Sequence, residues 1–242
     1  MKELFGSKVF DTPKPTQLIK WFLSLHGDDE GIVLDFFSGS SATADAVMQL
    51  NAEDQGRRRF IMVQLPESCN EDSEAFKAGY KTISDMSKDR IRRAGKKVSE
   101  ANQQVDVGFR SLKIDTSNMA DVYYTPDSLN KGQIDLLIGN IKPDRTPEDL
   151  LFQVMLDWGV DLALPINIQS IQGKDVFFVD GNALAACFDA SGSIDEMFVK
   201  ELAKHQPLRV VFRDAGYKNS AVKINVEQLF KLLSPITEVK CI

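Results

Sequence analysis

Residues 31–50 read GIVLDFFSGSSATADAVMQL, and residues 57–67 read RRRFIMVQLPE. The first stretch begins with a short, nearly continuous apolar run, which predicts a buried strand at 31–37. Apolar side chains then recur at helical spacing, which predicts a helix over 42–52. The second stretch predicts another buried strand at 59–65. A strand, a helix and a strand within this length predict a right-handed parallel βαβ unit.

The turn after the first predicted strand has the composition of a ligand-binding loop. Asp35 stands at the carboxyl end of the strand, and small residues and a helix start follow it. Ligands bind at this edge of open α/β sheets, and a helix start offers free N–H groups. Gly39 can adopt unusual backbone dihedrals, while Ser40 and Thr43 offer hydroxyls. On this loop alone, a ligand site and a plain packing unit are about equally favoured.

A second acid shifts the balance toward a ligand site. Glu67 stands just beyond the second predicted strand. A carboxylate there can accept hydrogen bonds from both ribose hydroxyls of an adenosine; a lone Glu would otherwise be read as an exposed loop acid. The loop lacks two glycines of the G-x-G-x-x-G pattern, since Ser41 and Ala44 occupy those places, and no P-loop lysine follows. A nicotinamide enzyme and a P-loop protein are therefore disfavoured.

Several segments, in order and spacing, resemble the modification subunit of type III restriction–modification systems, which are adenine-specific DNA methyltransferases. The cofactor-side segments are FDTPKPTQLI (10–19), the two stretches quoted above, and KAGYKTISDMSKDRIRRAGKK (77–97). The likeness continues through NIKPDRTPEDLLFQVMLDWGV (140–160), ALAACFD (183–189) and VVFRDAGYKNSAVKINVEQLF (210–230). It covers nearly the whole chain, and the later segments point to the type III subfamily.

The resemblance implies roles for particular residues in binding S-adenosylmethionine. It places Lys14, Pro15 and Thr16 in the motif that closes over the methionine end of the donor. It puts Asp35 near the donor amino group with Phe36 beside it, Gly39, Ser40 and Thr43 at the backbone and carboxylate end, and Glu67 on the ribose hydroxyls. The chain departs from the family pattern at two positions: Ser41 replaces the usual second glycine of the loop, and Asp45 stands where a basic residue or His is frequent.

The family's catalytic tetrapeptide, Asp-Pro-Pro-Tyr or a close relative, occurs nowhere in the 242 residues. In this family the tetrapeptide precedes the cofactor loop, so a truncated N-terminus would explain its absence. No catalytic residue is therefore expected in this chain, and we expect no methyl transfer by the chain alone. In the intact enzyme, DNA and a restriction subunit are the expected partners, and a homodimer is the expected assembly.

The predicted fold class is α/β: a Rossmann-like methyltransferase portion at residues 1–100, then a second, smaller α/β domain at 109–242 with its own core. A polar stretch at 99–108 marks the boundary. Further predicted elements are helices at 12–26, 72–98, 147–158, 194–204 and 226–233, and strands within 109–115, 160–171, 175–181, 183–189, 207–214 and 237–242. The basic run at 88–97 is more typical of a solvated face than of a phosphate contact.

Composition limits the remaining possibilities. The net charge of −6 disfavours a free-standing DNA binder, since phosphate neutralisation supplies most non-specific affinity. Cys69, Cys187 and Cys241 are far apart, and only two histidines could join them, so we expect reduced thiols and no metal site. No apolar stretch approaches the roughly 20 residues of a membrane helix, and no signal peptide is evident, so the expected compartment is the cytoplasm.

Two interpretations of the isolated chain remain open. In the first, the chain binds the methyl donor through a half-domain of a methyltransferase. In the second, the donor pocket is incomplete, and the chain is an assembly module that mediates dimerisation or docks the restriction subunit. Donor binding would support the first interpretation, and self-association without donor binding would support the second.

Overall fold

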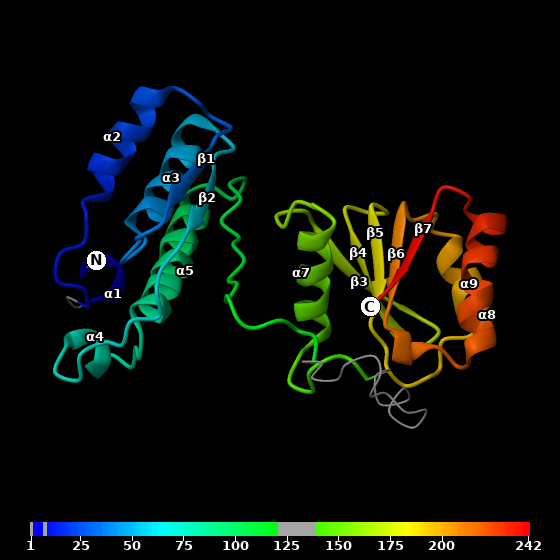
Figure 1. Cartoon of the computed structure of the whole chain (residues 1–242). Coiled ribbons are helices and arrows are strands. Elements are labelled where there is room, and N and C mark those ends of the chain that lie inside the picture. Colours follow the sequence, from blue (N-terminus) through cyan, green and yellow to red (C-terminus); the bar gives the residue numbers. More distant parts are fainter. Residues whose placement is uncertain (1, 7–8, 121–138) are drawn as a thin grey trace. The chain divides into compact units, whose positions relative to one another are not determined.

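The computed structural model describes residues 2–6, 9–120 and 139–242 (Figure 1). The chain forms two compact units, Met1–Lys113 and Ile114–Ile242. The second unit, expected to be the smaller, is the longer of the two. The polar segment after residue 101 belongs with the first unit, because Val105, Val107 and Phe109 pack against its core.

The first unit is built on a parallel pair of strands, β1 (Ile32–Asp35) and β2 (Arg59–Met62), joined through α3 (Ala42–Asp54). Ile32 pairs with Arg59 at one end, and Asp35 pairs with Met62 at the other. Backbone hydrogen bonds continue past both strand ends, from Val63 N to Asp35 O at 2.8 Å and from Ser38 N to Val63 O at 3.1 Å. Asp35 and the following loop therefore lie at the carboxyl edge of the pair.

Helices cover one face of this strand pair. Figure 1 shows α3 beside α5 (Ile83–Ala101), with α2 (Thr16–His26) on the other side of α3 and the short α1 (Lys2–Phe5) near α5. Ala44 and Met48 of α3 pack against Ile91 and Ala94 of α5, with side chains of β2 behind them. The small alanines let the two helices approach closely over the sheet.

The prediction that both strands are fully buried was wrong. Ile32, Leu34 and Ile61, which share one face of the pair, are 53%, 58% and 50% exposed. Successive strand side chains point to opposite faces, so the helix layer covers only alternate residues. Parallel sheets normally have both faces covered. Among the described residues, no element covers the second face.

The helix predicted at 12–26 begins later and exposes its apolar stripe. It starts at Thr16, after an extended Pro15 at the N-cap. Pro15 disfavours helical backbone at Lys14, the residue before it, so the helix does not extend back through these residues. Gly27 ends it in the left-handed conformation, which glycine adopts without steric cost. Leu18, Phe22 and Leu25, which form part of this apolar stripe, are 47%, 57% and 65% exposed.

The single helix predicted at 72–98 is two helices. The first, α4, spans Glu74–Lys77, and a turn with Gly79 at φ 94° separates it from α5. Thr82 caps α5 by accepting a hydrogen bond from the Asp85 N–H. The sequence pattern did not reveal this turn. Gly79 and the cap residue Thr82 lie within a polar stretch that is also compatible with one continuous helix.

The second unit is a five-stranded mixed sheet with helices on both faces (Figure 1). The strand order is β3-β4-β5-β6-β7, antiparallel from β3 to β5 and parallel from β5 to β7. The strands are β3 (Ile166–Ile171), β4 (Lys174–Val179), β5 (Leu184–Cys187), β6 (Arg209–Phe212) and β7 (Glu238–Cys241). The five strands predicted between residues 160 and 242 are therefore confirmed.

Alternate residues of the central strands face two separate cores. Phe177 and Val179 of β4 pack with α7 (Pro147–Asp157) on one face. Val176 and Phe178 pack with α8 (Glu196–Ala203) and α9 (Ser220–Leu233) on the other. The sheet is thus the middle layer of an α/β/α sandwich.

The strand predicted at 109–115 is absent; these residues have no regular structure. Alternating apolar and polar residues form a strand only where a neighbouring strand is present to hydrogen-bond with them. Phe109 instead packs against the first unit, where the Arg92 guanidinium lies 5.6 Å from its ring centroid.

Side chains cap the first turns of α7 and α8. Thr146 and Asp149 form a capping box around Pro147, and Gly159 follows the helix at φ 63°, as the sequence of α7 predicts. Helix α8 is capped by Asp195, while the Ser193 hydroxyl donates to the Asp189 carboxylate.

The start predicted for α9 was also wrong. The helix begins at Ser220, one turn and more before the predicted residue 226, with Asn219 as its cap. Asn219 accepts a hydrogen bond from the Val222 N–H at 3.0 Å. Both Asn219 and Asn225 are residue types that cap helices, and only the surrounding fold distinguishes them.

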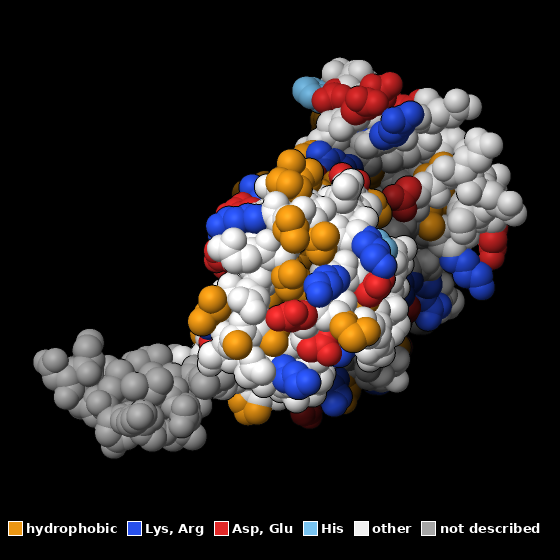
Figure 2. Space-filling view, turned by 90° about the vertical axis from the view of Figure 1, so that its right-hand side faces the viewer, with side chains coloured by type: hydrophobic (Ala, Val, Ile, Leu, Met, Phe, Trp, Pro, Cys, Tyr) orange, Lys and Arg blue, Asp and Glu red, His pale blue; other side chains and the backbone are white. Residues whose placement is uncertain are grey.

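The outer face of α8 and α9 mixes charged and apolar side chains. Figure 2 shows hydrophobic side chains interspersed with lysines and acids over this face. Met197, Ile224 and Leu232 are 67%, 72% and 77% exposed. Across the described residues, no helix is both long and apolar enough to cross a bilayer.

Candidate functional site

The predicted site lies at the carboxyl edge of β1, where a short loop joins the strand to α3. The Thr43 hydroxyl, from the first turn of α3, donates a 2.6 Å hydrogen bond to the Asp35 carboxylate. The Gly39 N–H donates to the Gln64 side-chain oxygen at 2.7 Å. The structure therefore joins Asp35 to Thr43, and it joins Gly39 to Gln64 of the adjacent chain segment.

The loop backbone uses left-handed conformations at two places. Gly39 has φ 50°, so the prediction of unusual dihedrals there is confirmed. Ser41 also has φ 53°, a conformation that costs a non-glycine residue about 1–2 kcal/mol. Ser41 is buried, and among the described residues its hydroxyl has only a long 3.5 Å contact to the Ser38 hydroxyl. The position where the family pattern has glycine thus has glycine-like geometry.

A buried arginine that the sequence reading did not single out lies beneath this loop. Arg90 of α5 is 2% exposed and donates to Ser40, Thr16 and Asp45. It stands four residues from both Met86 and Ala94 on the buried face of α5. An arginine on the apolar face of an amphipathic helix was the available signal, and the basic run at 88–97 concealed it.

The structure also gives Asp45, which departs from the family pattern, a clear set of partners. Its carboxylate lies 3.0 Å from Arg90 Nη2 and accepts a 3.2 Å hydrogen bond from the Thr16 hydroxyl. The Gln49 amide donates to its other oxygen at 2.7 Å. Thr16 is therefore tied to the loop region, while its neighbours Lys14 and Pro15 are exposed.

Two further predicted residues point outward. Glu67 is exposed, lies five residues beyond the end of β2, and has no side-chain hydrogen bond or ion pair among the described residues. Its backbone oxygen accepts from the Ile83 N–H at 2.9 Å, which fixes it near the start of α5. The Phe36 side chain is 62% exposed. The described contacts bring neither side chain to Asp35.

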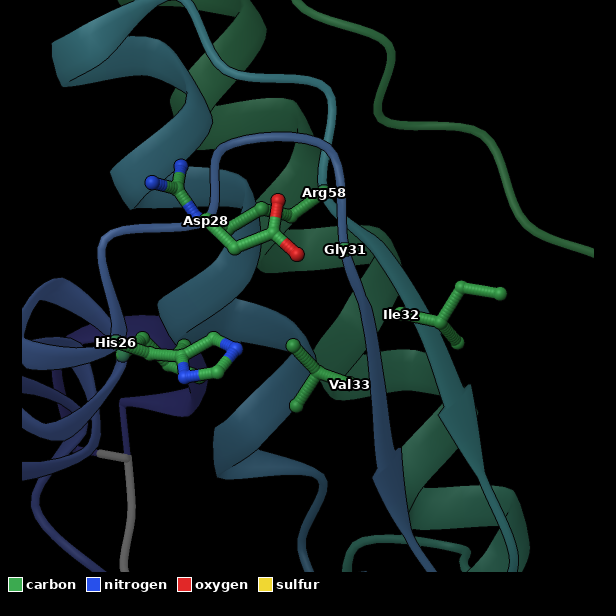
Figure 3. Close-up of a pocket in the computed structure, with 7 residues that line it drawn as sticks. His26, Asp28, Gly31, Ile32, Val33 and Arg58 are labelled. Carbon is green, nitrogen blue, oxygen red and sulfur yellow. The ribbon is translucent and has the colours of Figure 1, made fainter.

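A separate cavity of about 230 Å³ lies at the opposite end of the strand pair. Figure 3 shows the His26 ring directed toward Val33, with Asp28 and Arg58 near the entry to β1. The Arg58 guanidinium is paired with the Asp54 carboxylate at 2.8 Å. This cavity is at the amino end of β1 and β2, so none of the predicted donor-binding residues lines it.

The cysteines offer no ready nucleophile. Burial raises the pKa of the Cys69 thiol and raises that of Cys187 to about 11. Burial likewise raises the pKa of Cys241, whose sulfur lies 3.2 Å from the Tyr217 hydroxyl. Among the described residues, no group of three or more His, Cys, Asp or Glu side chains could hold a metal ion.

Comparison with known proteins adds an independent observation. The family model described as DNA methylase matches residues 1–74. The EcoP15I Mod subunit of Escherichia coli, a type III restriction–modification enzyme, is 44% identical over 96% of this chain and 35% of its own length. The StyLTI Mod subunit of Salmonella typhimurium is 46% identical over 47% of this chain and 18% of its own length.

A relative outside the type III group matches a shorter part of the chain. The type II methyltransferase M.KpnI of Klebsiella pneumoniae is 37% identical over 37% of this chain and 21% of its own length. The chain spans about a third or less of the length of each of these relatives. The chain is therefore similar to part of the modification subunits of type III restriction–modification systems, and its residues 1–74 match the DNA methylase family model.

Proposed function

We propose that residues 1–113 form the S-adenosylmethionine-binding part of an adenine-specific DNA methyltransferase of a type III restriction–modification system. The observation on which this rests is the carboxyl edge of β1, where Asp35, a loop of small residues and the start of α3 meet. This is the edge at which Rossmann-like sheets bind ligands. The DNA methylase match, over residues 1–74, includes this edge.

The side chains at this edge fit the methyl donor chemically. The carboxylate of Asp35 suits the donor's ammonium group, and the loop N–H groups at the start of α3 suit its carboxylate. Glu67 is exposed and unpaired among the described side chains, so it is available to two ribose hydroxyls. The methyl group of the bound donor is attached to a sulfonium sulfur, and the neutral thioether that remains after transfer is a good leaving group. The protein's role is therefore to bind and orient the donor.

The substrate of the intact enzyme is an adenine of duplex DNA, rotated out of the helix into a pocket. The side chains that would hydrogen-bond to the exocyclic amine of the adenine belong to the tetrapeptide that these 242 residues lack. The isolated chain would therefore bind the donor without transferring its methyl group. Parallel sheets normally have both faces covered, so the exposed apolar face of β1 and β2 supports the proposal that further chain segments complete this domain.

A second candidate role, assembly, concerns residues 114–242. A groove of about 260 Å³ lies between α8 and α9, lined by Leu229, Leu232 and Leu233 with Lys200 and Lys204 at its rim. We infer that this face takes part in homodimerisation. Sedimentation velocity should give a dimer that Leu232→Glu converts to a monomer, while Lys231→Gln on the same helix leaves it intact. A monomeric parent chain at high concentration would contradict this role and leave docking of the restriction subunit to be tested.

The donor-binding proposal is tested by calorimetric titration of the chain with S-adenosylmethionine, repeated with Glu67→Ala. Saturable binding that weakens at least tenfold in the variant is the expected result, about 1.4 kcal/mol of lost interaction. Glu71→Ala, in the same exposed segment, is the control and should bind like the parent chain. Absence of binding in the parent would mean that the pocket needs further residues.

A methylation assay completes the test. The purified chain is incubated with tritiated S-adenosylmethionine and DNA of mixed sequence, and incorporation is measured. We expect none above background. Robust incorporation would contradict the assignment of catalysis to residues outside this chain.

A further inference from the structure

We propose that Arg90 is a positioning residue that holds the donor-binding loop and the Thr16 segment in one arrangement, an inference that rests on the proposed function. Three segments far apart in the sequence meet at its guanidinium: the start of α2, the loop before α3, and α3 itself. All three contain residues predicted to bind the donor: Thr16, Ser40 and Thr43. We name Arg90 with Asp45, Ser40 and Thr16 the arginine clamp.

The contacts of the arginine clamp are divided between the two ends of the guanidinium. Nη1 donates to the Ser40 hydroxyl at 2.8 Å and to the Ser40 backbone oxygen at 3.3 Å. Nη2 donates to the Asp45 carboxylate at 3.0 Å and to the Thr16 hydroxyl at 3.1 Å. A planar guanidinium offers this fixed fork of donors, whereas a lysine ammonium is a single point charge.

A second side chain of α5 acts on the same loop. The Ser87 hydroxyl, one turn before Arg90, donates to the Gly39 backbone oxygen. The oxygens of two successive peptide groups, at Gly39 and Ser40, are thus directed toward α5. In a trans peptide, the N–H points opposite to the C=O of the same unit. The Ser40 N–H therefore faces away from α5, toward the edge where the donor carboxylate is expected.

Burial makes this arrangement rigid. The side chains of Arg90 and Asp45 are only 2% and 6% exposed. In such surroundings, charge-assisted hydrogen bonds are about twice as strong as neutral ones, and an unpaired charge is costly. The loop cannot leave the clamp without removing both Ser40 partners from Nη1 of a buried guanidinium. The left-handed backbone at Ser41 is held by the same contacts, since Ser40 and Asp45 flank it on both sides.

The competing explanation is an ion pair that stabilises the fold without influence on the site. The chain offers a matched control in Arg58, whose side chain is 5% exposed and paired with Asp54 at 2.8 Å. Arg58 also donates to the Asn51 side-chain oxygen at 3.3 Å. It lies at the amino end of β2, away from the loop, so its substitution perturbs an equally buried arginine without touching the site.

The test compares Arg90→Lys with Arg58→Lys in the complete 242-residue chain. Circular dichroism and thermal unfolding first test whether each variant folds. If Arg90→Lys does not fold, Asp45→Asn replaces it as the clamp variant. Hydrogen exchange followed by mass spectrometry then measures protection of peptides spanning residues 38–45. Calorimetric titration measures the affinity for S-adenosylmethionine.

We expect Arg90→Lys to speed exchange in residues 38–45 and to weaken donor binding about tenfold or more, the equivalent of one lost charge-assisted hydrogen bond. Arg58→Lys should leave both quantities within twofold of the parent. Equal effects of the two substitutions, or unchanged loop exchange in Arg90→Lys, would overturn the inference. If the parent chain does not bind the donor, the proposed function fails for this chain, and the exchange result alone decides whether the clamp fixes the loop.

Discussion

The Thr43 hydroxyl and the Asp35 carboxylate are joined by a 2.6 Å hydrogen bond that spans the loop between β1 and α3. This bond links the last residue of a strand to the first turn of the following helix. It fixes the position of one carboxylate oxygen of Asp35 and thereby sets the direction in which the other oxygen points. Two residues that the sequence separates by eight positions therefore act as one unit at the sheet edge.

Thr43→Val, which keeps the shape and removes the hydroxyl, should weaken S-adenosylmethionine binding about fivefold to tenfold, because Asp35 loses a partner worth about 1–1.5 kcal/mol. Thr43→Ser keeps the hydroxyl and should bind within twofold of the parent. Calorimetric titration of the three proteins gives the comparison. Equal affinities for Thr43→Val and the parent would show that the bond does not orient the acid for the donor.

Ser41→Gly should stabilise the first unit by about 1 kcal/mol, because Ser41 has φ 53° and its hydroxyl makes only a 3.5 Å contact. The measurement is the urea midpoint of unfolding. Gly39→Ala is the reciprocal variant: at φ 50° an added Cβ is strained, so this change should destabilise by a similar amount. A lower midpoint for Ser41→Gly would mean that the serine contributes interactions that outweigh its backbone strain.

The stability of the first unit should depend on pH through Asp54. Its hydrogen bond with Arg58 holds the pKa of the Asp54 carboxyl below its ordinary value of 3.8. A carboxyl with a lowered folded pKa stabilises the fold above its unfolded pKa, and this contribution is lost as the pH falls through the folded pKa. The parent should therefore exceed Asp54→Asn in urea midpoint at pH 6, and the difference should shrink below about pH 4. A difference that stays constant from pH 7 to pH 3 would contradict this.

Cys187 should resist alkylation in the folded protein. Burial raises the pKa of its thiol to about 11, and the residue is fully buried in β5. Only the thiolate reacts with iodoacetamide, so at pH 8 peptide mass spectrometry should find Cys187 unmodified while urea-unfolded protein is fully modified. Early modification of Cys187 at the rate seen for Cys241 of the edge strand β7 would show that the sandwich of the second unit opens readily.

The sequence predicted the parts of this protein that depend on neighbouring residues. Asp35, the positive φ of Gly39 and the helix start at 42 follow from local residue types, because small residues and glycine limit what the backbone can do. The capping box at Thr146 follows for the same reason. These features need no partner from elsewhere in the chain.

Features that need a distant partner could not be predicted in this way. The strand expected at 109–115 has no neighbour to pair with, and Asn219 rather than Asn225 begins α9. The apolar runs of β1 and β2 were correctly identified as strands, but their burial depends on what covers each face. Ile32 and Leu34 are exposed because helices cover only the opposite face.

By itself, the sequence determined the parallel strand–loop–helix unit, the small-residue loop after Asp35 and the likeness to type III modification subunits, since all of these are encoded in short contiguous segments. Only the tertiary structure decided that Arg90, 50 residues beyond Ser40, lies buried under that loop and is paired with Asp45. The reason is physical: a charge enters the core only where several partners converge to satisfy it. That convergence of α2, α3 and α5 is a property of the packing of the helices.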